Sequence, residues 1–391
     1  MRFSVHSPVH FLWPTLRRHF RFGLLACLCV LLVAPLARAS STDGISVQGS
    51  GVQPQLGFAC CDQGIAQMQE LFAHSDVVAN LKSLHAQVAV AIADFSPERA
   101  KVVRMLNQQK IPVIAGLMLQ TKDGPYFNAD DVAEAPAQIA AFEKWSQDNG
   151  LRWAAIGIDI EPNFGELAAL RSHPWRLVTT LVPNAFDSKR MERAQEAYSA
   201  MIVQIQSQGY PVETYTLPYG PVEQMVHTTV LDRLLGTVDV KGDENDLMIY
   251  TSYARPVGSA IIPDLGSDAQ GIIVGITDGP PPSGSGFGPL DWDEFSSDLI
   301  VASHFAHHLG VYNLEGCVQQ GFLQRLRNLD WGRTVVIPAA SVSRAHRHVM
   351  AFEIALWTLA HLLYFIAAIF LFTIWLFWRW RLRRHRLMLS D

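Results

Sequence analysis

The sequence predicts an α/β protein built as a (β/α)8 TIM barrel, with a signal peptide before it and one C-terminal transmembrane helix after it. Short apolar runs rich in β-branched residues alternate with helical patterns eight times beyond about residue 55. This alternation favours a parallel sheet closed into a barrel. A basic and then apolar segment lies near the N-terminus, and a longer apolar segment followed by five arginines lies near the C-terminus.

Residues 1–39 are typical of a secretory signal peptide. Arginines precede an apolar run over residues 22–36, and an Ala-Arg-Ala cleavage pattern ends at Ala39. We therefore expect the mature chain to begin with a linker over residues 40–54. An uncleaved N-terminal anchor is the alternative, but the apolar run is shorter than the ~20 residues that a span requires.

Eight apolar runs are predicted to form the strands of a barrel domain over residues 55–333. Several are nearly continuous, as expected for parallel strands covered on both faces. They lie at residues 55–61, 87–95, 111–120, 153–162, 212–219, 246–253, 271–278 and 308–315. An open doubly wound sheet is the alternative, but it usually carries a G-x-G-x-x-G loop after the first strand, which residues 57–62 do not match.

The segments between the strands mostly have helical patterns. Residues 97–109 follow Ser96, a good N-cap, and start with proline. Further helical patterns cover residues 65–84, 135–149, 188–208, 222–235, 292–307 and 318–329. Residues 255–270 are rich in Gly, Pro, Ser and Asp and fit either a loop or a short helix.

Residues 350–378 are almost wholly apolar. As a helix they would be about 43 Å long at 1.5 Å per residue, enough to cross the ~30 Å hydrocarbon core of a bilayer. Five arginines follow in residues 379–391, against two in the stalk expected at 334–349. The positive-inside rule then puts the tail in the cytoplasm and the barrel on the periplasmic or extracytoplasmic side. A buried core helix is the alternative reading.

The formal net charge is −5, and no basic stripe points to nucleic acid. The mature chain would keep Cys60, Cys61 and Cys317. Because the first and eighth strands of a barrel are neighbours, a disulfide from Cys317 to one of the other two would staple the seam; three small buried hydrophobic side chains are the alternative. No C-x-x-C pair exists, and we expect no metal or cofactor.

The fourth predicted strand holds the strongest functional signal, the Gly-Ile-Asp-Ile-Glu run at residues 157–161. Strand alternation puts Asp159 and Glu161 on one face. Two carboxylates this close repel each other, which raises one pKa and leaves one group protonated near neutral pH. A protonated acid beside an ionised one is what glycoside cleavage needs. Glu315, at the end of the eighth run, is expected across the barrel mouth.

This run resembles the fourth-strand motif D-G-x-D-x-D-x-E of chitinase-like glycoside hydrolases of family 18. Gly157 and Asp159 fall on motif positions, but Glu161 falls on an Asp position. Asn163 stands where that family has its proton-donating Glu, and Ile156 replaces the leading Asp. The resemblance therefore implies the glycosidase barrel superfamily and not the mechanism of family 18 itself.

Polar and aromatic residues at other strand ends are candidates for binding sugar. The expected set is Asp94, Trp175, Tyr219, Tyr250, Tyr253, Arg255 and Tyr312. Each site residue also has a structural reading: Asp159 fixing the barrel mouth, Glu161 paired with Arg255 or Lys122, Glu315 accepting N–H groups at the last helix, and the tyrosines packing in the core. His304, His307 and His308 have helical spacing and no carboxylate motif beside them, which favours a solvated face over a metal site.

These patterns lead to the expectation of a membrane-anchored glycoside hydrolase-like barrel acting on an envelope or extracellular polysaccharide. Asp159 and Glu161 would supply acid and electrostatic catalysis, and Glu315 would serve as base or nucleophile. A non-catalytic glycan-binding barrel is the alternative. A hydrolase of phosphoesters or acyl groups is a weaker one, since neither a metal cluster nor a G-x-S-x-G motif supports it.

Overall fold

A computed structural model describes residues 44–119, 124–163, 179, 182–279 and 288–388. The expected signal peptide at 1–39 and Trp175 lie outside the described residues.

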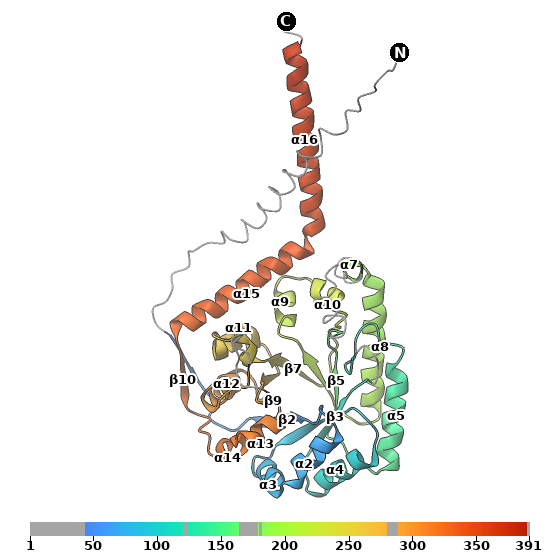
Figure 1. The fold of residues 1–391 in the computed structure, drawn as a ribbon, viewed down its shortest axis with the longest axis vertical. Coiled ribbons are helices and arrows are strands. Elements are labelled where there is room, and N and C mark those ends of the chain that lie inside the picture. The colour runs from blue at the N-terminus through green and yellow to red at the C-terminus, as the bar shows by residue number, and fades with distance from the viewer. Residues whose placement is uncertain (1–43, 120–123, 164–178, 180–181, 280–287, 389–391) are drawn as a thin grey trace, which may run out of the picture. The chain divides into compact units, whose positions relative to one another are not determined.

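The predicted (β/α)8 barrel is confirmed, with eight parallel strands closed into a ring (Figure 1). In ring order the strands are β2 (Gln55–Cys60), β3 (Gln87–Ile92), β4 (Val113–Leu117), β5 (Ala155–Asp159), β6 (Val212–Thr216), β7 (Glu244–Ile249), β8 (Gly271–Gly275) and β9 (His308–Tyr312). The last strand pairs with the first in the register Gln55↔His308. Closure excludes the open sheet, and each strand is shorter than the apolar run that predicted it.

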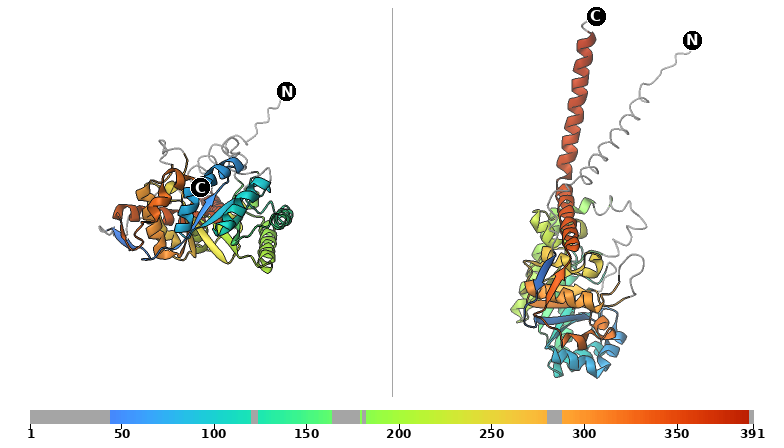
Figure 2. Two further views of the ribbon diagram at one scale, coloured as in Figure 1. Left: turned by 90° about the horizontal axis from the view of Figure 1, so that it is seen from below. Right: turned by 90° about the vertical axis from the view of Figure 1, so that its left-hand side faces the viewer.

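Helices surround the strands (Figures 1 and 2). They are α2 (Ile65–Ala73), α3 (Ser75–Ser83), α4 (Pro97–Gln108), α5 (Ala135–Asp148), α7 (Val182–Asn184), α8 (Ser188–Ser207), α9 (Gly220–Met225), α10 (Val230–Leu235), α11 (Ile262–Gly266), α12 (Trp292–Phe305), α13 (Leu314–Gln319) and α14 (Phe322–Leu326), with 3-10 turns η3 (Thr251–Ala254) and η4 (Gly258–Ile261). The expected N-cap is present, because Ser96 Oγ accepts from the N–H of Arg99 at 3.2 Å.

Two segments predicted as single helices are each divided into two shorter helices. The helix expected over residues 222–235 is divided into α9 and α10, and the Glu223 carboxylate accepts the N–H groups of Leu231 and Asp232 at the start of α10, at 2.8 and 3.2 Å. The segment after the eighth strand forms α13 and α14, separated at Gly321, whose φ of +68° is a conformation that favours glycine.

A two-stranded antiparallel sheet lies outside the barrel. It joins β1 (Ile45–Gln48), in the segment expected to be a linker, to β10 (Thr334–Ile337), in the segment expected to be a stalk. The pairing ties both ends of the barrel domain together. Sequence patterns missed it because the two strands are four residues each and lie at opposite ends of the domain.

The C-terminal apolar segment forms two helices, α15 (Ala339–Ala360) and α16 (Leu362–Met388). Helix α15 packs on the barrel domain through the buried side chains Ala345, Val349 and Leu356, against η4 and α9 among others. Among the described residues, Tyr364–Arg381 is the one helical stretch long and apolar enough to cross a membrane, and none of it is buried.

The barrel interior is hollow toward its carboxyl end because inward-facing positions carry small residues. Ala59, Ala89, Ala91 and Gly116 line a cavity there. Ala115, next to Gly116 on β4, instead lies in the packed core with no exposed surface. TIM barrels usually fill this space with layers of branched side chains, so small residues here leave room for a ligand.

We predict that Ala91→Leu and Ala115→Leu differ sharply in stability, although both add the same atoms. The Ala91 side chain projects into the cavity, so the change should alter the free energy of unfolding by about 1 kcal/mol at most. Ala115 lies in the packed layer, where overpacking should cost about 1–3 kcal/mol. Denaturant unfolding of the detergent-solubilised chain measures both values; equal destabilisation would contradict the assigned orientation of the strand.

Candidate active site

A cavity of about 630 Å³ lies inside the carboxyl end of the barrel. Most of its lining is apolar, including Ala59, Ala91, Met118, Leu217, Met248 and Ile273. Two carboxyl groups from the fourth barrel strand, Asp159 and Glu161, also line it. Among the described lining residues there is no lysine and no arginine. The cavity therefore combines an apolar wall with a few polar groups, as ligand pockets commonly do.

Strand alternation brings Asp159 and Glu161 to the same inner face, as predicted. Asp159 is the last residue of β5. A segment from the preceding loop then holds the backbone beyond it: Phe127 N–H donates to Asp159 O at 3.0 Å, and Glu161 N–H donates to Phe127 O at 2.9 Å. The Asn128 side-chain amide donates to Glu161 O at 2.7 Å. Glu161 is thus fixed in an extended conformation, with 9% of its surface exposed.

The two carboxyl groups interact directly, and this interaction changes the pKa of each. Withdrawal from water, together with the neighbouring Glu161 carboxylate, raises the pKa of Asp159 well above its ordinary value. Burial also raises the pKa of Glu161, to about 7, although the hydrogen bond from Asp159 opposes this. Burial therefore favours a protonated carboxyl group within this pair near neutral pH.

Tyrosines form the polar part of the cavity wall. Tyr126, Tyr215, Tyr250 and Tyr312 line it, and Tyr253 lies at the rim with 56% of its surface exposed. The rings of Tyr250 and Tyr312 lie 5.7 Å apart between centroids. Burial raises the pKa of Tyr250 well above its ordinary value, and the charges of Asp159 and Glu161 raise it further. These phenols therefore stay protonated and can donate hydrogen bonds to a ligand.

A third carboxylate, Asp62, lines the cavity just beyond β2. Its Oδ2 accepts a hydrogen bond from the Tyr312 hydroxyl at 2.6 Å. Its Oδ1 is buried and has no hydrogen-bond partner in the described part of the chain. Asn313, also in the lining, donates to Asp278 Oδ2 at 3.0 Å.

Glu315 is not among the residues that line the cavity. Strand β9 ends at Tyr312, and Asn313 caps α13, so Glu315 lies in the first turn of a helix and not on a strand. Its Oε1 accepts the Cys61 N–H, just beyond the end of β2, at 2.8 Å. Burial raises the pKa of Glu315 to about 7.

Three further sequence candidates are held by partners outside the cavity lining. Asp94 forms an ion pair with the fully buried Arg99 at 2.8 Å, and although burial opposes it, hydrogen bonds from Arg99 and Ser96 lower the pKa of Asp94 to about 2. Arg255 binds Glu294 through two hydrogen bonds, at 2.6 and 2.8 Å. The Tyr219 hydroxyl lies 2.6 Å from Thr237 Oγ1, beside a separate small pocket.

The prediction of a disulfide from Cys317 to Cys60 or Cys61 is wrong. Cys60 and Cys61, which are adjacent in the chain, form a disulfide with each other. Cys317 is a free, fully buried thiol on α13, 3.8 Å from Thr277 Oγ1. Because Cys60 lines the cavity, the disulfide is part of its wall.

The sequence analysis missed Tyr126, Tyr215 and Asn313 as cavity residues. Tyr215 lies within a strand, where strand-end reasoning does not look. Tyr126 comes from the loop after β4, and only the closed ring shows that this loop reaches the cavity. Asn313 lies within the predicted run at residues 308–315, next to Tyr312, but was not chosen as a candidate.

No family model matches the sequence, and no curated protein matches it. Similar solved structures include a family 2 AP endonuclease from Brucella melitensis, at 11% identity and a TM-score of 0.38, covering 68% of this chain and 98% of that one. A D-allulose 3-epimerase from Methylomonas sp. has 9% identity and a TM-score of 0.34, covering 78% of this chain and 100% of that one.

The expectation of a glycoside hydrolase is wrong. The similar solved structures include an AP endonuclease and two sugar epimerases. The resemblance to family 18 likewise finds no support, since no family model matches. The site agrees with this correction, because Glu315 is absent from the cavity lining and the wall is mostly apolar.

We predict that Glu161→Gln flattens the pH dependence of stability. A carboxyl group whose pKa is raised by folding stabilises the fold below its unfolded pKa, and this contribution is lost as pH rises through the folded value. Between pH 5 and pH 8 the wild type should therefore lose about 2 kcal/mol more than the variant. Denaturant unfolding at both pH values measures this difference.

The exposed Glu196 on α8 provides the control, and Glu196→Gln should follow the wild type. The same pH dependence in Glu161→Gln and in the wild type would mean that Glu161 ionises as it does in the unfolded chain.

Proposed function

We propose that this protein is an enzyme that transfers protons to and from carbon in a small, uncharged, largely apolar substrate. The observation that carries this proposal is the Asp159–Glu161 pair of carboxyl groups, whose pKa values are raised by burial in an apolar cavity. A carboxylate with a raised pKa is a stronger base than an ordinary one, and a protonated carboxyl beside it is a hydrogen-bond donor.

The lining supports an uncharged substrate. Phosphate and carboxylate groups are usually bound by arginine or lysine, and the described lining has neither. The polar groups that are present, tyrosine hydroxyls and a protonated carboxyl, are suited to a carbonyl oxygen. A cavity of about 630 Å³ falls within the usual range for small-molecule sites.

The chemistry follows from these groups. Glu161 takes the proton from a carbon next to the carbonyl, and the electron pair of that C–H bond moves to the carbonyl oxygen. The protonated Asp159 and a tyrosine hydroxyl donate hydrogen bonds to this oxygen as its negative charge develops. The protonated Glu161 then returns the proton to the same carbon or to a conjugated one. The net reaction is an isomerisation that consumes no cofactor.

Deuterium exchange tests this proposal without knowledge of the product. The wild type, incubated in D2O with a panel of small apolar ketones and enones, should exchange α-hydrogens of at least one compound, as followed by mass spectrometry. Glu161→Gln and Asp159→Asn should each slow exchange by about 10²–10⁴-fold, the usual contribution of a general acid or base. The rate should rise with pH as Glu161 ionises and fall again when Asp159 loses its proton.

Glu223→Gln is the matched control, because burial also raises the pKa of Glu223 to about 7 but Glu223 does not line this cavity. It should keep the wild-type rate. Wild-type exchange rates in both cavity variants would contradict the proposal, and tight binding of panel compounds without any exchange would favour a binding protein.

We also infer that Tyr364–Arg381 spans a membrane, with the barrel on the periplasmic or extracytoplasmic side. The apolar side chains of α16 are exposed, including Phe370, Leu371 and Trp378. Arginines follow the span and favour a cytoplasmic tail. A membrane anchor would also keep the apolar cavity close to substrates that partition into lipid.

Cysteine labelling tests this orientation. In spheroplasts of a bacterial host, a membrane-impermeant maleimide should modify Val336→Cys, since Val336 is 68% exposed on β10. It should modify Ser390→Cys only after the membrane is lysed. Among the described cysteines, Cys317 is buried and Cys60 and Cys61 are paired, so these three should add little background labelling. Labelling of Ser390→Cys in intact spheroplasts would contradict the inferred orientation.

A further inference from the structure

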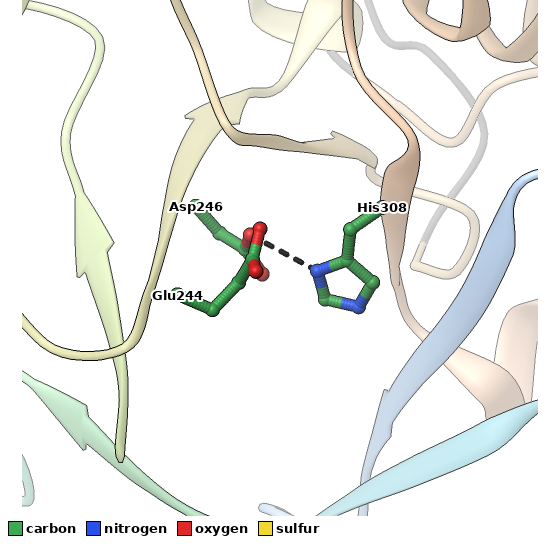
Figure 3. A group of neighbouring side chains, drawn as sticks. All are labelled: Glu244, Asp246 and His308. Carbon is green, nitrogen blue, oxygen red and sulfur yellow. Dashed lines mark hydrogen bonds and ion pairs between the residues drawn. The ribbon is translucent and has the colours of Figure 1, made fainter. Parts of the chain in front are cut away.

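A second group of titratable side chains lies at the amino end of the barrel, away from the carboxyl pair. Glu244 and Asp246 come from β7, and His308 comes from the start of β9 (Figure 3). One potential ligand atom from each of the three lies within 4.8 Å of the others. His308 Nδ1 is 3.1 Å from Asp246 Oδ1. Asp246 and His308 are 1% and 6% exposed.

The strand register explains why these residues meet. Strand β8 lies between β7 and β9, and its first residue, Gly271, pairs with Asp246 on one side and His308 on the other. A Cβ atom at Gly271 would overlap Asp246 Oδ1 and crowd His308 Nδ1. Only glycine at this position lets the two side chains meet across the intervening strand.

We propose that Glu244, Asp246 and His308 bind one divalent metal ion of the zinc or manganese type. One imidazole nitrogen with two carboxylates is a ligand set that such ions accept, whereas Mg²⁺ and Ca²⁺ prefer oxygen alone. Three protein ligands at ~2.0–2.2 Å from zinc would lie roughly 3.4 Å apart. The present spread, with all three ligand atoms inside 4.8 Å, needs only a small side-chain movement to reach this.

A separate observation points to a ligand here. Glu244 Oε1 is buried and accepts no hydrogen bond in the described part of the chain. A buried carboxylate oxygen without a partner is costly unless it is paired or coordinates a metal. Among the described ion pairs, none brings a lysine or arginine to Glu244 or Asp246. A metal ion would supply the missing partner of Glu244 Oε1.

The second ring nitrogen of His308, Nε2, also has a hydrogen-bond partner. His308 Nε2 lies 2.9 Å from the Gln87 side-chain amide. A primary amide carries both a donor and an acceptor, so Gln87 can accept Nε2–H once Nδ1 is used for a metal. Metal-binding histidines usually have a partner of this kind on their second nitrogen, which fixes the ring and the tautomer.

This site is distinct from the proposed active site and does not depend on its function. Glu213 lies beside the group on β6, and the Tyr215 hydroxyl, 3.4 Å from Glu213 Oε2, separates it from the cavity above. The bound ion would neutralise charge where the barrel interior is closed, and would join β7 to β9. We therefore expect it to stabilise the barrel and not to touch the substrate.

The test uses the full chain in detergent, with a purification tag that contains no histidine, after treatment with a chelator. Isothermal titration with ZnCl2 and with MnCl2, together with elemental analysis after gel filtration, should show one equivalent of at least one of the two metals. Glu244→Gln should weaken binding at least tenfold. This variant should fold, because the oxygen that it alters makes no hydrogen bond in the described structure. His308→Gln should weaken binding at least as much.

Glu223→Gln, a buried carboxyl on α9 outside the group, should bind like the wild type. The metal should also raise the melting temperature of the wild type and of Glu223→Gln but not of Glu244→Gln. If His308→Gln does not fold, Glu244→Gln and the melting temperatures decide. The absence of stoichiometric zinc and manganese binding in the wild type, or unchanged binding in Glu244→Gln, would overturn the proposal.

Discussion

Two carboxyl groups that face one apolar cavity cannot both be ionised at low cost, and the candidate active site depends on this constraint. Coulomb repulsion between Asp159 and Glu161 is poorly screened where little water surrounds them. Burial raises the pKa of both groups, and the Glu161 carboxylate raises that of Asp159 further. An acid and a base side by side follow from the burial of the pair, and no lysine or arginine is present in the described part of the cavity lining. The same cavity wall keeps the tyrosine hydroxyls protonated.

The hollow barrel explains how such a pair exists. Small residues at inward positions such as Ala89 and Gly116 leave the upper interior open. At the other end, Glu213, Asp246 and His308 fill the interior with polar side chains. The barrel interior thus has two parts. The apolar cavity with the Asp159–Glu161 pair lies toward the carboxyl end, and a layer of buried titratable side chains lies toward the amino end. Each depends on residues without bulk: alanine around the cavity, and Gly271 where Asp246 and His308 approach each other.

Much of the fold was predictable from the sequence because strand periodicity is a local property. All eight barrel strands lie within the apolar runs, apart from the first two residues of β7, and the Asp159–Glu161 pair followed from alternation alone. The prediction that Glu315 faces the site did not hold because β9 ends three residues earlier. A helix begins there and turns the side chain with a different geometry. Arg255 was predicted to bind substrate, but it is bound to Glu294, a partner that lies 39 residues away in the sequence. The β1–β10 pairing and the group around His308 also depend on contacts between distant segments, which no local pattern records.

Infrared spectroscopy tests the central claim, that Asp159 and Glu161 share one proton at neutral pH, most directly. A difference spectrum at pH 7 between the wild type and Asp159→Asn should show the C=O stretch of one protonated carboxylic acid in the wild type alone. That band should disappear only at higher pH, when the second proton of the pair is lost. A difference spectrum at pH 7 that contains carboxylate bands and no protonated acid would show that both groups are ionised, and would contradict the account.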